Sequence, residues 1–185
     1  MIPTAAAIAH APFQLDPAIQ DALTNPLLSS SLWVMIALMG VALLLFVSMS
    51  QNVTDSRVRL ILVATIGIPA VSISSYFGLA SGLAISVFEI AGRGEVVSLW
   101  GRYLTWTFST PLILLALGML AGSTPSKIGT AIGFDILMCV TGLAAAVTTR
   151  AIWMRWAWFV LSSAFFVVVL YILLVEWPED ATAQS

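Results

Sequence analysis

Charged residues are scarce in this chain of 185 residues: 9% are Asp, Glu, Lys or Arg, 60% are hydrophobic, and the mean hydropathy is +1.03. Soluble domains carry roughly 25% charged residues, so the composition excludes a cytosolic enzyme. One cysteine excludes a disulfide scaffold, and the single histidine, His10, has no metal-ligand spacing around it. A formal net charge of −2 is too balanced for a nucleic-acid-binding surface. An integral membrane protein remains.

Long intervals with almost no charge predict five membrane-spanning helices. At most one charged residue falls in each of the intervals 22–54, 60–88, 103–126, 128–149 and 156–175. Each interval reaches the roughly 20 residues that a helix needs to cross a hydrocarbon core of ~30 Å. We therefore expect an all-α bundle with helices near residues 27–50, 58–88, 98–121, 127–149 and 152–177.

The distribution of basic residues predicts the orientation. The tail 1–26 contains no lysine or arginine, whereas the connector after the first expected helix carries Arg57 and Arg59. Basic residues favour the cytoplasmic side of the cell membrane. We expect a multi-pass protein with an extracellular N-terminal tail. The tail also lacks the basic flank and compact apolar stretch of a signal peptide, so the first helix is expected to stay as a permanent span.

A polar face is expected on the helix 98–121. Arg102 lies about one turn inside it, and Thr105, Ser109 and Ala116 follow at helical spacing on the same face. No carboxylate lies on this face, and hydroxyl groups can solvate an anion but cannot neutralise a guanidinium. The face therefore suits a mobile anion. Alternatively, Arg102 reaches the outer interface and the hydroxyls bond back to their own helix.

The run WGRYLTWTFSTP at residues 100–111 resembles the third helix of the haloarchaeal microbial rhodopsins, and in particular that of the halorhodopsins. Proton pumps of this group carry Asp, Thr and Asp where the chain has Thr105, Ser109 and Ala116, and these three residues match the chloride-pump triplet instead. The resemblance covers nearly everything after residue 25. It includes the runs Pro69–Tyr76, Phe134–Leu143 and Tyr171–Trp177.

This resemblance implies a seven-helix fold of which the chain holds five helices, residues 27–177. It implies a light-driven inward chloride pump in which all-trans retinal forms a Schiff base with a lysine on the seventh helix. Chloride would be bordered by Thr105, Ser109 and Trp106, with Arg102 as the positive charge on the extracellular side. The implied partners are retinal, chloride and the lipid bilayer, and trimers are common in the family, which makes a homotrimer one expected assembly.

The resemblance also implies a retinal pocket. Its residues would be Trp106, Thr110, Met138, Gly142, Phe159, Ser162 and Phe166. Aromatic faces would sandwich the polyene and Gly142 would leave room for it. Without the family match, the alternative interpretation is ordinary packing inside a helix bundle. Asp135 is expected to be hydrogen-bonded between helices, and Cys139 to be a small packing residue.

Two departures from the family pattern are a connector at residues 89–100 that is shorter than usual in the family, and the C-terminal part. Residues 178–185 correspond to the start of a cytoplasmic connector, so the sixth and seventh helices are missing, and a partial sequence is the simplest explanation. The only lysine is Lys127, at an expected turn, which leaves no Schiff-base lysine in this chain. Two other functions stay open: a sensory rhodopsin, against which Thr105 argues, and a non-pigmented membrane protein of five helices.

Overall fold

The computed structural model describes residues 15–90, 92, 94–149 and 151–183. Five helical segments in that part of the chain are long and apolar enough to cross a membrane. They are α3 (Pro26–Ser50), α4 (Ser56–Ala80), α5 (Gly101–Leu120), α6 (Pro125–Val147), and a last segment that joins α7 (Ile152–Tyr171), the π-helix η1 (Ile172–Glu176) and α8 (Trp177–Thr182). The predicted bundle of five spans is confirmed.

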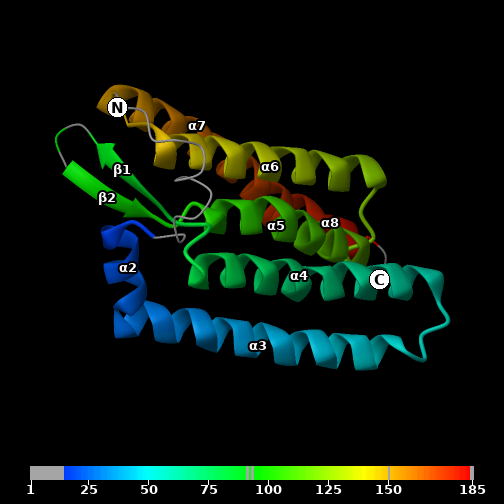
Figure 1. The fold of residues 1–185 in the computed structure, drawn as a ribbon. Helices are drawn as coiled ribbons and strands as arrows, with labels where there is room; N and C mark the ends of the chain where they lie inside the picture. Colours follow the sequence, from blue (N-terminus) through cyan, green and yellow to red (C-terminus); the bar gives the residue numbers. More distant parts are fainter. Residues whose placement is uncertain (1–14, 91, 93, 150, 184–185) are drawn as a thin grey trace, which may run out of the picture.

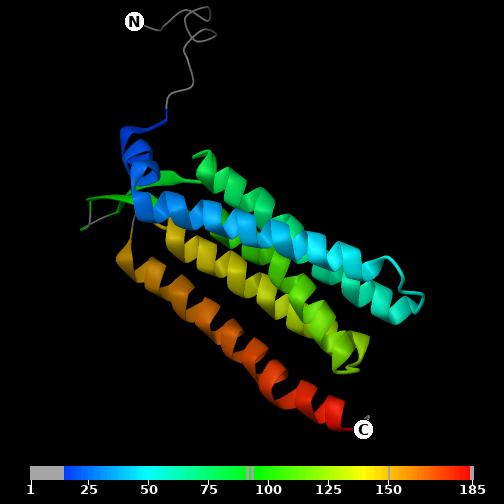
Figure 2. The ribbon, with the colours of Figure 1, turned by 90° about the horizontal axis from the view of Figure 1, so that it is seen from below.

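The helices lie side by side in chain order (Figures 1 and 2). Each of α3 to α7 packs against the next one along the chain. A short helix, α2 (Pro17–Thr24), and a hairpin of the strands β1 (Ser86–Ile90) and β2 (Gly94–Ser98) lie beside the start of α3. We call this the hairpin end of the bundle. Many large apolar side chains on the helices are exposed, as expected of surfaces that contact lipid rather than water.

Side-chain caps explain where three of the long helices begin. The Asn25 side chain accepts hydrogen bonds from the amides of the first turn of α3, and Asp55 does the same for α4 at 2.9 Å. Thr124 caps α6. Pro26 and Pro125 follow two of these caps, at first helical positions where a missing N–H does no harm. Each cap satisfies backbone donors that would otherwise lack a partner.

The second long helix is shorter than the sequence predicts. The expected helix runs from 58 to 88, whereas α4 ends at Ala80 and residues 86–90 form β1, paired antiparallel with β2. The chain leaves the helical conformation at Gly82, whose φ of 79° lies in the left-handed region. The uncharged interval 60–88 therefore covers a helix, a turn and part of a strand. Absence of charge reports an apolar environment and not a helix.

The last helix is longer than expected, because it continues past 177 to Thr182. The π-helix η1 lies just before Trp177, which is buried in a cluster at the end of the bundle opposite the hairpin. The cluster consists of Leu114, Ile128, Ala131, Val169, Ile172 and Trp177. Asp180 accepts a hydrogen bond from Ser123 at 2.6 Å and forms an ion pair with Lys127 at 2.7 Å. These contacts fasten α8 to the connector between α5 and α6 and to the first turn of α6.

Close packing at Gly101 gives a test of the fold. A Cβ atom on Gly101 would lie 2.5 Å from the Cβ of Ala84, an atom that cannot move without its backbone, whereas a Cβ on Gly129 of α6 would meet nothing within 4 Å. We expect Gly101→Ala to destabilise the bundle by about 1–3 kcal/mol. Gly129→Ala, the matched control, should leave stability unchanged or raise it by up to about 1 kcal/mol. Detergent-induced unfolding followed by circular dichroism measures both, and equal stabilities would contradict the packing.

Candidate functional site

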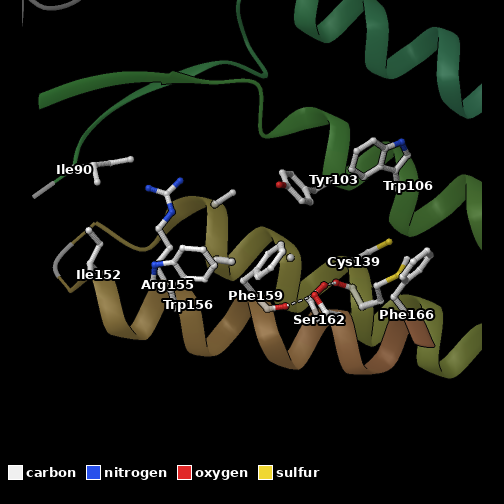
Figure 3. A pocket seen from close by; sticks show the side chains of 15 residues that line it. Ile90, Tyr103, Trp106, Cys139, Ile152, Arg155, Trp156, Phe159, Ser162 and Phe166 are labelled. Carbon is white, nitrogen blue, oxygen red and sulfur yellow. Dashed lines mark hydrogen bonds between the residues drawn. The ribbon is translucent and has the colours of Figure 1, made fainter. Parts of the chain in front are cut away.

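A mostly apolar groove of about 770 Å³ lies between α5, α6 and α7 (Figure 3). Side chains from α5 and α7 face each other across this space. Six of the seven residues predicted for a retinal pocket line the groove: Trp106, Met138, Gly142, Phe159, Ser162 and Phe166. These six positions come from three helices, so the family resemblance selects residues that the fold brings together.

Thr110 is the one predicted pocket residue that does not line the groove. Its hydroxyl donates to the carboxylate of Asp135 on α6 and also lies 2.6 Å from the carbonyl oxygen of Trp106. Asp135 is 3% exposed. The expected hydrogen bond of Asp135 between helices is thus confirmed. Thr110 joins α5 to α6 behind the groove instead of forming its wall.

The floor of the groove depends on Gly142. A Cβ atom there would lie 3.3 Å from both the Ser162 hydroxyl and the Tyr103 ring. Ser162 in turn donates to the carbonyl oxygen of Met138 at 2.8 Å, which holds α7 against α6. Because the Ser162 hydroxyl and the Tyr103 ring already lie this close to Gly142, the side chain of a larger residue at position 142 would extend into the groove.

Several lining residues were not predicted from the sequence. They are Ile90, Tyr103, Cys139, Ala145, Ala146, Ile152, Arg155, Trp156 and Ser163. Those on α7 share the helical spacing of Phe159, Ser162 and Phe166. The same spacing, continued toward the start of α7, could have predicted them. Cys139, buried as expected, follows the predicted Met138. Ile90 carries no such signal, because it belongs to the unpredicted hairpin.

The hydroxyls of the predicted chloride site are buried, and that of Thr105 faces α4. Thr105 and Ser109 are 9% and 4% exposed, and neither lines the groove. Thr105 lies 3.0 Å from the carbonyl oxygen of Gly101 and contacts the hydroxyl of Ser75, which itself donates to Gly101 at 3.1 Å. Ser75 was not predicted as a site residue, although it lies in the run 69–76 that carries the family resemblance. Among the residues that the structure describes, Ser109 makes no side-chain hydrogen bond.

Arg102 lies on a different side of α5, exposed, with its guanidinium carbon 5.1 Å from the centre of the Trp106 ring. Both side chains line a smaller cavity next to the groove. The four predicted chloride residues therefore divide into two pairs. Arg102 and Trp106 lie together, whereas Thr105 and Ser109 are buried and line neither cavity. Of these four residues, Trp106 is the one that borders both cavities.

Residues 26–185 match the family model of the bacteriorhodopsin-like proteins. The chain belongs to this family. It is 58% identical over 178 residues to a halorhodopsin of Natronomonas pharaonis, a match that covers 88% of this chain and 61% of that protein. A halorhodopsin of Halorubrum sodomense is 59% identical over 163 residues, with 85% of this chain and 57% of that protein covered. The chain thus spans about three fifths of the length of these relatives.

Comparison with solved structures indicates the same family. One, described as halorhodopsin, a light-driven chloride pump, has a TM-score of 0.83 and 53% sequence identity to this chain. The match covers 86% of this chain and 69% of that one. The fold is that of the seven-helix microbial rhodopsins, and its family makes this chain a multi-pass membrane protein with five of those helices in the described part.

The contact between α4 and α5 gives the second test. Ser75→Ala removes hydroxyl contacts with Thr105 and Gly101, and we expect a loss of about 1 kcal/mol in stability. Ser74→Ala is the matched control, because Ser74 is exposed and donates to Ala70 of its own helix at 3.0 Å. It should change stability by less than about 0.5 kcal/mol. Unfolding in detergent compares the two, and an equal loss from both would show that the hydroxyl contact contributes nothing.

Proposed function

We propose that this chain is the five-helix part of a light-driven inward chloride pump that uses all-trans retinal. The observation that carries the proposal is a guanidinium beside an aromatic groove without any carboxylate on its walls. All nine acidic residues of the chain lie in the described part, and none lines either cavity. Thr105 stands where proton pumps of the family resemblance carry a carboxylate. A mobile anion is the counter-charge that such a site accepts.

The groove fits retinal. Its volume of about 770 Å³ lies within the range of small-molecule sites, and its walls are mainly apolar and aromatic. Trp106, Phe159 and Phe166 would hold a polyene through their flat faces, while Gly142 leaves room beneath it. When bound, retinal supplies light absorption and an isomerisation. Lys127, the only lysine, does not line the groove and pairs with Asp180, so covalent attachment would come from outside these 185 residues.

The residues of α5 would bind chloride in two ways. Arg102 would attract the anion at the hairpin end, and the hydroxyls of Thr105 and Ser109 would replace part of its hydration shell. The Thr105 hydroxyl would turn from Gly101 toward the anion to do so. Ala116, buried further along the same face, offers no proton donor, which an anion pump does not need. The protein would move an ion without changing a substrate covalently, and would be a transporter, not an enzyme.

The direction of transport rests on the orientation. Arg57 and Lys127 lie at the end of the bundle opposite the hairpin, next to the connectors there. The basic connector after the first span favours the cytoplasm for that end, and the hairpin end would then be extracellular. Inward transport would carry chloride from the hairpin toward α8. The halorhodopsin relatives favour this function over a sensory receptor or a non-pigmented scaffold, and the homotrimer stays a prediction.

Pigment formation tests the groove. The chain is expressed with all-trans retinal, with and without a fragment that holds the sixth and seventh helices of a halorhodopsin. A visible pigment should form only in the complemented sample. Gly142→Leu should weaken retinal uptake about tenfold, since the added side chain overfills the groove. Gly133→Leu is the control, because a Cβ on Gly133 meets nothing within 4 Å. No pigment in either sample would contradict the pocket.

Chloride titration of the same complemented pigment tests the anion. Its absorption maximum should shift as chloride is added, because the anion is the counter-charge. Thr105→Val and Ser109→Ala should each raise the half-saturating chloride concentration about tenfold, the effect of losing one hydrogen bond to an anion. Thr107→Val serves as control, since Thr107 donates to Tyr103 of its own helix at 2.7 Å. A pigment whose absorption ignores chloride would refute the pump.

A further inference from the structure

The carboxylate of Asp180 joins α8 to two neighbouring elements at once. One of its oxygens lies 2.7 Å from the ammonium group of Lys127 on α6, and the other accepts a hydrogen bond from the Ser123 hydroxyl at 2.6 Å. The side chains of Lys127 and Asp180 are 40% and 22% exposed. Because both reach the solvent, water can replace these contacts when they break, so the attachment of α8 is reversible.

The connector that receives Asp180 has a fixed shape. α5 ends in a Schellman motif, in which Gly122 has a φ of 68° and the amide of Ser123 donates to the carbonyl oxygen of Gly118 at 2.9 Å. The amide of Gly122 donates to Met119 at 3.1 Å. Thr124 then caps α6. The Ser123 hydroxyl is therefore held in place by the connector itself, whether or not α8 lies against it.

Trp177 covers Gly118 at the same end of the bundle. A Cβ atom on Gly118 would lie 3.0 Å from the Trp177 ring, which is 4% exposed. The indole N–H is buried and has no hydrogen-bond partner among the described residues. Burial of the ring favours this position, whereas burial of an unpaired donor opposes it. The contacts of Asp180 therefore weigh strongly in the balance.

The backbone just before α8 is suited to bending. Pro178 has no N–H to donate to the preceding turn, and the π-helix η1 lies directly before Trp177. Proline and π-turns are the usual places where long helices bend. The helix α7 is held separately, because Ser162 donates to the carbonyl oxygen of Met138 on α6 at 2.8 Å. A bend between 172 and 178 would therefore move α8 and leave α7 in place.

We propose that α8 is a hinged latch over the end of the bundle opposite the hairpin. In its closed state Asp180 holds the connector between α5 and α6, and Trp177 covers Gly118. In its open state the contacts of Asp180 break, α8 turns about η1 and Pro178, and the Trp177 ring leaves the apolar cluster. Water then reaches the facing ends of α5 and α6. The latch uses no residue of the groove or of the predicted chloride site, so it does not rest on the proposed function.

Hydrogen–deuterium exchange, read by mass spectrometry on the whole chain in detergent, tests the latch. Asp180→Asn removes the ion pair and the charged acceptor of Ser123. We expect the amides of residues 177–182 to exchange about tenfold faster, the effect of losing one charge-assisted hydrogen bond. Glu179→Gln is the matched control, because Glu179 is the neighbouring exposed carboxylate and forms no ion pair in the described part of the chain. Circular dichroism checks that both variants fold.

A second substitution tests the hinge. Pro178→Ala returns the missing N–H to the helix, and a continuous helix resists bending at that place. Added to Asp180→Asn, it should slow the exchange of residues 177–182 again by about threefold. The amides of residues 152–170 should keep the same protection in every variant, because α7 does not move.

The outcomes separate a latch from an ordinary surface ion pair. Equal exchange in Asp180→Asn and Glu179→Gln would overturn the latch. Faster exchange spread evenly over residues 152–182 would show that the whole span loosens, and an unchanged rate after adding Pro178→Ala would show no bend there; either result overturns the hinge. The measurement needs neither retinal nor chloride, so its failure leaves the proposed pump standing, and a failed pump leaves the latch standing.

Discussion

The charge of Arg102 is the constraint on which the rest of the site depends. The guanidinium lies beside Trp106 on α5, and none of the carboxylates of the chain reaches either cavity. A charge in such surroundings is tolerated only with compensation. In the proposed pump, an anion from solution would balance the charge of Arg102, and the electrostatics of the protein would then depend on the salt around it.

The five spans could be predicted because lipid imposes a simple rule: about 20 residues without charge. The same rule could not show that α4 stops at Ala80, since an apolar turn and strand look the same as an apolar helix when only charges are counted. The left-handed Gly82 decides that point. The pocket residues came from the family resemblance, and six of seven face one groove because their helices pack as the family fold requires.

The partners of single side chains were less predictable. Helical spacing placed Thr105, Ser109 and Ala116 on one face correctly, and all three are buried. Spacing cannot say which neighbour a residue of that face meets, and in the structure Thr105 contacts Ser75 on α4 and does not line the groove. Arg102 was predicted on the same face but lies to one side. The arginine side chain is long enough to place its guanidinium in polar surroundings away from the helix face on which its Cα lies.

The π-helix η1 has a consequence for the tolerated length of the last span. A π-turn accommodates one residue more than a regular helical turn, and each residue rotates the rest of the helix by about 100°. With η1 as it stands, Trp177 meets Gly118 and Asp180 reaches Lys127. Deleting one residue between 172 and 176 would turn both away while leaving composition and hydropathy almost unchanged. The number of residues in this stretch therefore matters more than its hydropathy, because an insertion or deletion there would separate the end of the span from the bundle.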